Sequence, residues 1–175
     1  ADELTKEGYQ VTILDIKNSK WLRDDQKFVK GNILNDKDLE KVIKKSTYVF
    51  NFASISDIED SLKNPLETAK VNIVALIKIL KLCVKHKINQ YVHASSVYVS
   101  GNRGGFYKSS KIAAESYVEE FYNIYGLKYS ILRYGTLYGE RSDKNNGLHQ
   151  IIKTAILKKK IEYSGDVNAM RDYIN

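Results

Sequence analysis

The feature that most constrains the fold is a regular alternation between short apolar segments and longer amphipathic ones. Segments rich in β-branched and aromatic residues, such as "TYVFNFA" and "NQYVHASS", lie at 10–16, 27–33, 47–53, 89–96 and 127–135. Segments with helical character lie at 1–9, 36–45, 64–86, 106–125 and 147–160. Continuous apolar strands that alternate with helices are typical of a parallel sheet covered on both faces. The sequence therefore predicts an α/β fold with a doubly wound parallel sheet.

The segment 64–86 carries the sequence signals of a helix start. Asn64 can cap the helix, Pro65 suits its first turn, and Glu67 occupies the position of the acid in a capping box. Apolar residues then recur at helical spacing along the rest of the segment. We therefore expect one long helix that begins at Asn64.

The net charge of +7 at pH 7, from 28 basic and 21 acidic residues, makes nucleic acid a partner to consider. The placement of the lysines argues against it. Lys78, Lys81 and Lys85 recur at helical spacing beside an apolar stripe, which is typical of a solvated helix face. We therefore expect no nucleic-acid partner, and a basic surface equally attracts a phosphorylated small substrate.

Cysteine content and hydropathy narrow the class of protein further. The single Cys83 excludes an internal disulfide and a multi-cysteine metal site, and we expect no bound metal. Cys83 lies in an apolar segment, where a buried and inert thiol is expected. Lysines interrupt the apolar stretches well before a membrane-spanning length, and the first ten residues have no signal-peptide character. We expect a cytoplasmic protein without a membrane partner.

The stretch "SSVYVSGNRGGFYKSSK", residues 95–111, places polar side chains at the end of a predicted strand. Parallel α/β sheets bind ligands at the carboxyl ends of their strands, where Ser95 and Ser96 are expected to lie. Tyr107 and Lys111, four residues apart, share one helix face. A phenol titrates near ~10, and an adjacent ammonium favours its ionised form. The stretch indicates a proton-transfer site, although among 13 tyrosines this spacing also arises by chance.

The order of the motifs resembles the extended short-chain dehydrogenase/reductases, in the branch of NAD-dependent nucleotide-sugar epimerases and dehydratases. The resemblance extends over nearly the whole chain. Its motifs are an acid after the family's second strand, "FNFAS", a helix Asn, a strand ending in Ser, Tyr-x-x-x-Lys, "LRYGTLYG" and "RDYIN". The resemblance implies a Rossmann-type fold, NAD as cofactor, a nucleotide-sugar substrate and a homodimer.

The resemblance also implies a catalytic trio. Tyr107 would transfer the proton, Lys111 would stabilise the phenolate and hold the nicotinamide ribose, and Ser96 rather than Ser95 would bind the reacting sugar oxygen. For both serines the alternative is hydrogen bonding of backbone groups at the strand end. The connection "VYVSGNRGGF" is shorter than is typical of the family, and its glycines permit a tight return. The shortening removes part of the usual substrate-side wall. The sequence therefore constrains the reaction chemistry more closely than the identity of the substrate.

Further residues resemble the family's cofactor contacts. The carboxylate of Asp15 can bind the adenine ribose and repel a 2′-phosphate, which favours NAD over NADP, and an ordinary solvated strand-end Asp is the alternative. Asn72 resembles a helix Asn that stabilises the active-site strands, and it should have a specific partner. The other implied cofactor contacts are Asn32, Ile33, Phe52, Ala53, Ser54, Tyr134 and Gly135.

The last part of the chain is expected to belong to a different region of the fold. We predict an NAD-binding domain at 1–140 and the start of a substrate-binding region at 141–175, interleaved with it. Asn146 and Arg171 resemble residues that bind the sugar diphosphate, a role that suits a bidentate guanidinium. The family's first strand and Gly-x-x-Gly-x-x-Gly loop have no counterpart in this sequence. We therefore expect the chain to be an internal piece of a longer enzyme.

The residues that follow Ser96 help to separate the reaction types of this family. Dehydratases carry an Asp-Glu pair there, because elimination of water needs an acid and a base. Val97 and Tyr98 occupy these positions here, which favours an epimerase that acts through a transient keto intermediate. The alternatives are an NAD(P)-dependent dehydrogenase or reductase, a dehydratase and, from another class, a non-catalytic nucleotide-sensing scaffold on the same fold.

Overall fold

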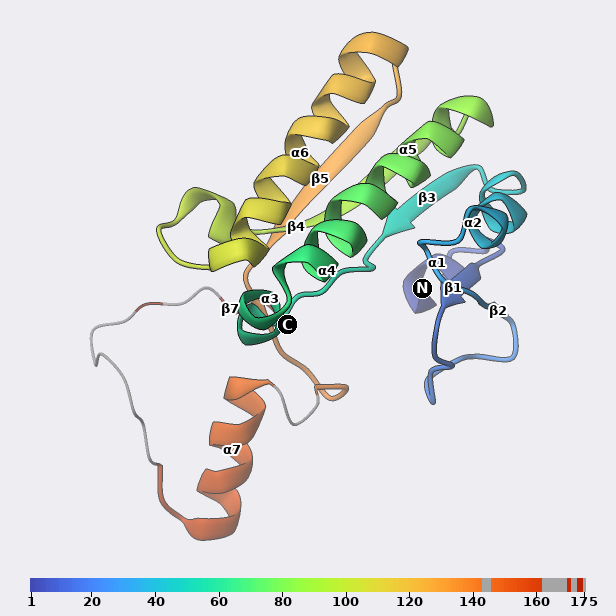
Figure 1. Ribbon diagram of the computed structural model, residues 1–175. Coiled ribbons are helices and arrows are strands. Elements are labelled where there is room, and N and C mark those ends of the chain that lie inside the picture. Colours follow the sequence, from blue (N-terminus) through green and yellow to red (C-terminus); the bar gives the residue numbers. More distant parts are fainter. Residues whose placement is uncertain (143–145, 162–169, 171–172, 175) are drawn as a thin grey trace. The chain divides into compact units, whose positions relative to one another are not determined.

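The computed structural model of the chain describes residues 1–142, 146–161, 170 and 173–174 (Figure 1). It divides into two compact units, Ala1–Leu132 and Arg133–Asn175. The sequence predicts a domain boundary after residue 140, and the described units divide after Leu132.

The strands described in the first unit form two sheets. Strand β1 (Thr12–Asp15) pairs in parallel with β2 (Lys27–Lys30). Strands β3 (Tyr48–Asn51), β4 (Gln90–Ser96) and β5 (Tyr129–Tyr134), the last of which crosses the unit boundary, form a second sheet in this order. Strands β3 and β4 are parallel, with Asn51 opposite His93. The five predicted strand segments and the α/β class are thereby confirmed.

Helices alternate with these strands. The first unit contains α1 (Asp2–Lys6), α2 (Asp36–Ile43), α3 (Ile58–Lys63), α4 (Pro65–Ala69), α5 (Ala75–Lys85) and α6 (Gly105–Tyr125). Helix α3 is absent from the sequence prediction because six residues are too few for a helical apolar pattern. Its start is nevertheless encoded, since the carboxylate of Asp57 accepts the backbone N–H of Asp60 at 2.9 Å.

The predicted long helix over 64–86 is present and differs in detail. It consists of α4, a π-helical turn η1 (Lys70–Val74) and α5. Pro65 begins α4 as predicted, but the side chain of Asn64 makes no capping hydrogen bond. Asn64 also ends α3, with its backbone N–H bonded to the carbonyl of Asp60 at 2.9 Å, and Glu67 forms an ion pair with Lys70 at 3.6 Å. Closure of the preceding helix therefore sets the conformation at this junction.

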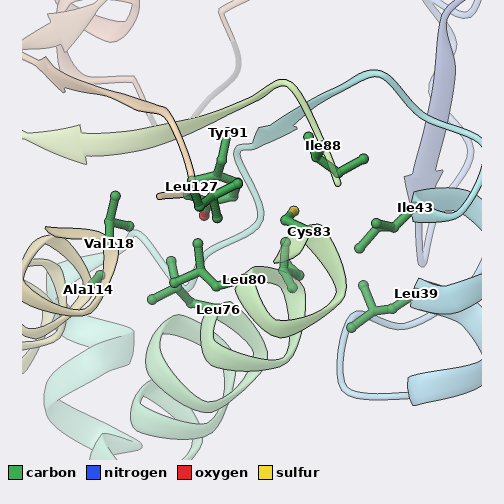
Figure 2. Close-up of a cluster of buried hydrophobic side chains, with 11 residues drawn as sticks. Leu39, Ile43, Leu76, Leu80, Cys83, Ile88, Tyr91, Ala114, Val118 and Leu127 are labelled. Atoms are coloured by element: carbon green, nitrogen blue, oxygen red, sulfur yellow. The ribbon is translucent and has the colours of Figure 1, made fainter. Parts of the chain in front are cut away.

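The hydrophobic core of the first unit lies where α2, α5 and α6 meet the β3–β5 sheet (Figure 2). Helices α5 and α6 lie side by side along this sheet (Figure 1). Leu80 and Cys83 of α5 and Tyr91 of β4 are 0% exposed. Burial raises the pKa of the Cys83 thiol to about 12, so the expectation of an inert, buried cysteine is confirmed. This packing fixes α6 against the carboxyl end of β4.

The described part of the second unit is small. Helix α7 (Gly147–Lys158) confirms the predicted helix over 147–160, and two short strands, β6 (Thr136–Leu137) and β7 (Tyr173–Ile174), pair in parallel. The side-chain oxygen of Asn146 caps α7 by accepting the backbone N–H of His149 at 2.9 Å. Within the described residues of both units, no helix combines the length and the apolar character that a bilayer crossing needs.

Candidate active site

A tight turn brings the start of α6 back to the end of β4. The 3₁₀ turn η2 (Val97–Ser100) follows β4 directly, and Gly104 and Gly105 then adopt positive φ angles of 117° and 51°. A Cβ atom at Gly104 would lie 2.8 Å from the Cβ of Lys108. The glycine return predicted from the sequence is thus present, and it places Tyr107 in the first turn of α6.

Ser96 and Tyr107 meet at this point. Ser96 ends β4, is 5% exposed, and accepts the backbone N–H of Tyr98 on its hydroxyl oxygen at 3.3 Å. Its hydroxyl is also hydrogen-bonded to the Tyr107 phenol. The Tyr107 ring is 8% exposed and meets the Tyr98 ring edge-on, with the ring centroids 6.3 Å apart. A serine and a phenol are therefore held together in a largely water-excluded position.

Lys111 lies one helical turn after Tyr107 and is 4% exposed. Its Nζ atom lies 5.6 Å from the centroid of the Tyr107 ring and donates a hydrogen bond to the carbonyl of Ala94 at 2.8 Å. The structure therefore brings all three predicted catalytic residues, Ser96, Tyr107 and Lys111, to the junction of β4 and α6.

Burial controls the proton affinities of this group. It raises the pKa of the Tyr107 phenol, while the hydrogen bond with Ser96 acts in the opposite direction. It lowers the pKa of the Lys111 ammonium to about 8, and the Glu115 carboxylate opposes that change. The sequence predicts a lowered Tyr107 pKa beside Lys111. In the structure desolvation dominates instead, so the pKa of the phenol is raised and the phenol holds its proton at neutral pH.

Asn72 connects this group to the loop after β3. It lies in the π-helical turn η1 and is 4% exposed. Its Oδ1 atom accepts the backbone N–H of Ile55 at 2.8 Å and the hydroxyl of Ser54 at 3.2 Å. Its Nδ2 atom donates to the carbonyl of Ile55 at 3.0 Å and to the hydroxyl of Ser110 at 2.9 Å. The expectation of a specific partner for Asn72 is confirmed.

The adenine-side candidates lie at the ends of β1 and β2. Asp15 ends β1, is exposed, and accepts the backbone N–H of Lys17 on Oδ1 at 2.9 Å. The side-chain oxygen of Asn32 accepts the N–H of Leu34 at 2.9 Å, so a local turn already uses the atom expected to face adenine. Ile33 packs against the hydrophobic core.

The candidates after β3 differ in their surroundings. The ring of Phe52 is 59% exposed, so it is open to a ligand. The backbone N–H of Ala53 donates to the Asn51 side chain at 3.2 Å, and the hydroxyl of Ser54 is bonded to Asn72. Two buried side-chain amides, those of Asn51 and Asn72, therefore hold this loop by hydrogen bonds.

Sequence reasoning missed a set of buried polar residues behind the site. Asn51 donates to the Tyr91 hydroxyl at 3.0 Å, and that hydroxyl lies 3.3 Å from Nδ1 of His93. The Ser95 hydroxyl donates to the Glu115 carboxylate at 2.5 Å. The available signals were polar residues inside apolar strands and, for Glu115, a position one turn after Lys111.

The remaining candidates belong to the second unit. Tyr134 ends β5 and Gly135 follows it. Asn146 donates its side-chain N–H to the carbonyl of Leu137 at 2.5 Å. A shallow pocket of about 340 Å³ is lined by Leu137, Tyr138, Gly139, Arg141, Ser142 and Asn146. Arg171 lies outside the described residues. Across the part of the chain that is described, no three His, Cys, Asp or Glu side chains gather as a metal site.

Comparison with known proteins identifies the family. The sequence model of the NAD dependent epimerase/dehydratase family matches residues 1–175. The chain belongs to this family. A protein of Methanocaldococcus jannaschii named putative UDP-glucose 4-epimerase is 31% identical over 195 residues, which cover 99% of this chain and 64% of that protein. The chain thus spans a little under two thirds of the length of this epimerase/dehydratase relative.

Solved structures of epimerases have the same fold. The UDP-glucose 4-epimerase of Thermotoga maritima with UDP-glucose has a TM-score of 0.88 and 26% identity, over 99% of this chain and 63% of that chain. The Thermus thermophilus UDP-glucose 4-epimerase in complex with NAD has a TM-score of 0.83 and 24% identity, over 99% and 65%. The latter comparison shows the fold alone. The Rossmann-type α/β fold of the epimerase/dehydratase family is therefore present in this chain.

We predict that His93 makes the folded state sensitive to acid. Burial, together with the Lys111 charge, lowers the folded-state pKa of His93 from 6.5 to about 4. Between about pH 6.5 and 4 the imidazole is therefore protonated in the unfolded chain but neutral in the folded chain. The stability contribution of neutral His93 is lost as the pH falls through this range. The expected loss is about 3 kcal/mol.

Urea unfolding of the full-length protein across this pH range checks the prediction. The His93→Gln variant, which cannot titrate there, should lose less stability on acidification than the wild type. Equal pH dependence in the two proteins would show that another group is responsible.

Proposed function

We propose that the full-length protein is an NAD-dependent epimerase that acts on a nucleotide sugar through a transient keto intermediate. The observation that carries the proposal is the buried group of Ser96, Tyr107 and Lys111 at the junction of β4 and α6. Membership of a family of NAD-dependent epimerases and dehydratases supports it. The names of the relatives support a UDP-linked sugar as the first substrate to test.

The residues present fit NAD. Asp15 offers an exposed carboxylate at a strand end, Phe52 offers an exposed ring, and the ammonium of Lys111 has three donors, of which one bonds Ala94. In the proposal Asp15 holds the adenine ribose, Phe52 and Ala53 line the cofactor, and Lys111 holds the nicotinamide ribose. Asn32, Ile33, Ser54 and Asn72 shape the walls. The resemblance to the family also assigns a cofactor contact to Tyr134 and Gly135. Bound NAD would supply a reversible hydride acceptor for the reacting sugar carbon.

The chain's own residues move the proton. The sugar hydroxyl gives its proton to the Tyr107 oxygen as the carbonyl forms, and the same proton returns when the alcohol is restored. Ser96 binds the reacting oxygen. The phenol must ionise to accept a proton, and its raised pKa opposes this step. The hydrogen bond with Ser96 and the charge of Lys111 are the two features of this chain that favour the phenolate.

The surroundings of Ser96 favour epimerisation over elimination. Turn η2 consists of Val97, Tyr98, Val99 and Ser100, and none of these side chains is a carboxylic acid. The nearby carboxylate of Glu115 is buried and bonded to Ser95. A dehydratase would need an acid from elsewhere in the full-length protein. A dehydrogenase or reductase remains the other enzymatic alternative, and a nucleotide-sensing scaffold the non-enzymatic one.

The proposal includes a binding role for Asn146 and Arg171 toward the sugar diphosphate, a cytoplasmic location and a homodimer. The homodimer rests on the resemblance to the family. Sedimentation of the purified full-length protein as a monomer would remove the homodimer from the proposal.

Replacement of Tyr107 by Phe tests the enzymatic assignment. Tyr107→Phe removes the proton carrier with little change of volume, so turnover of the full-length protein should fall by roughly 10²-fold or more while NAD binding persists. Tyr117→Phe is the matched control, because Tyr117 lies on the same helix and is 42% exposed. Near-normal turnover in Tyr107→Phe would show that Tyr107 is misassigned.

The cofactor preference is tested by titration calorimetry. Asp15 is exposed at the end of β1 and no arginine directly follows it, so NAD should bind at least about tenfold more tightly than NADP, or about 1.4 kcal/mol. Asp15→Asn should narrow the difference, because it removes the charge that repels the 2′-phosphate. Equal affinities in the wild type, or a preference for NADP, would contradict the assignment of Asp15.

The reaction type is decided by the product. Given NAD and a UDP-hexose deuterated at the reacting carbon, the full-length protein should yield a product of unchanged mass, inverted configuration and retained deuterium. Chromatography coupled to mass spectrometry measures all three. A product lighter by one water would identify a dehydratase, and stoichiometric release of NADH would identify a dehydrogenase. Absence of turnover with any nucleotide sugar tested would favour the scaffold.

A further inference from the structure

A second charged residue, Glu115, is buried next to the proposed catalytic group. Glu115 lies on α6 one turn after Lys111 and is 6% exposed, while Lys111 is 4% exposed. A buried carboxylate is costly unless hydrogen bonds or an opposite charge compensate it. The hydroxyl of Ser95 on β4 donates to its Oε1 atom at 2.5 Å, and the Lys111 ammonium interacts with it electrostatically.

The ionisable groups around Lys111 come from three elements. Glu115 and Tyr107 flank it on α6. His93 faces it from β4, and its lowered pKa keeps it neutral at physiological pH. Tyr98 of η2 packs against Tyr107. Among these groups Glu115 is the carboxylate, so it supplies the negative charge that acts on the ammonium.

We propose that Glu115 is a positioning residue for the proton transfer. Its carboxylate keeps Lys111 in the ammonium form, and its hydrogen bond with Ser95 holds the end of β4 against α6. This inference rests on the proposed roles of Tyr107 and Lys111. The inference assigns Ser95 a function as well. The Ser95 hydroxyl fixes the end of β4, and Ser96 extends from this strand end to Tyr107.

The direction of the electrostatic effect follows from the burial of Lys111. Desolvation lowers the Lys111 pKa to about 8, and Glu115 opposes the decrease. Loss of the carboxylate charge would lower this pKa further, so that Lys111 becomes neutral within the physiological range. A neutral amine lacks the positive charge that stabilises a phenolate. When Glu115 is neutralised, the pH above which turnover declines should therefore move to a lower value.

Two variants separate the two parts of the role. Glu115→Gln keeps a side-chain oxygen that can accept from Ser95 but removes the charge. Ser95→Ala removes the hydrogen bond but leaves the charge beside Lys111. In the full-length protein, Glu115→Gln should shift the alkaline limit of kcat/KM to lower pH by about one unit or more, a tenfold loss at the wild-type limit. Ser95→Ala should lower the rate without moving this limit.

Glu119→Gln and Glu115→Asp complete the set. Glu119 is exposed on the same helix, so its neutralisation should leave the pH profile unchanged. Glu115→Asp retains the charge and should keep the alkaline limit close to that of the wild type, which tests the charge even if Glu115→Gln fails to fold. A limit shifted as strongly in Glu115→Asp as in Glu115→Gln would overturn the electrostatic role.

A readout without turnover separates this inference from the proposed function. Nuclear magnetic resonance of protein labelled at its lysine side chains, with the Lys111 signal assigned from Lys111→Met, gives the titration midpoint of Lys111 directly. The midpoint should fall by about one pH unit or more in Glu115→Gln. An unchanged midpoint overturns the inference, even if the epimerase activity is found. A lowered midpoint in a protein that turns over no nucleotide sugar supports the charge effect while the proposed function fails.

Discussion

The hydrogen bonds of one buried amide hold the candidate site together. Asn72 uses both polar atoms of its side chain, binding the loop after β3 through Ile55 and the second turn of α6 through Ser110. The Ser110 hydroxyl in turn donates to the carbonyl of Tyr107 at 2.7 Å. Because a buried amide left without partners is costly, these bonds are made together or lost together. The position of the Tyr107 backbone therefore depends on a residue that lies in a different helix.

The π-helical turn η1 explains how this amide reaches both partners. A π turn inserts one residue into an α-helix and rotates the side chains that follow it, and such turns are frequent at functional sites. The turn spans Lys70–Val74, between α4 and the apolar stripe of α5. Asn72 points to the site while Leu76 and Leu80 remain 1% and 0% exposed in the core. One continuous helical segment thus serves packing along α5 and hydrogen bonding at η1.

The fold and the site differ in how far the sequence predicts them. The strands at 10–16, 47–53 and 89–96 are predictable because apolar runs of that length, bounded by helices, allow few alternatives. The predicted capping bond of Asn64 is wrong because a short helix, α3, ends at this residue. The helix over 64–86 is present, but its π turn was not predicted because no local pattern marks one. Helix propensity is local, whereas the side chain in the π turn is bonded to Ser110 of α6, far away in the sequence.

For the site, the residue types and spacing located Ser96, Tyr107 and Lys111 at one strand–helix junction. They did not indicate the raised pKa of Tyr107, because desolvation depends on the atoms that cover the ring. They also did not indicate the partners of Ser95 or Asn32, whose hydrogen bonds depend on side-chain direction. Sequence spacing defines which groups share a face, and burial decides their protonation.

The placement of carboxylates around the site connects its chemistry to its stability. A carboxylate in turn η2, next to Ser96, would be free to donate a proton to a substrate, as elimination requires. The carboxylate of Glu115 instead lies behind the site, between α6 and β4. There the Ser95 hydroxyl and the Lys111 ammonium compensate its burial. It can therefore influence the protonation of Lys111 without access to the substrate. Glu115 lies behind Lys111, and turn η2 carries only apolar, phenolic and hydroxyl side chains. This arrangement supports the proposed reversible proton transfer at one oxygen rather than loss of water.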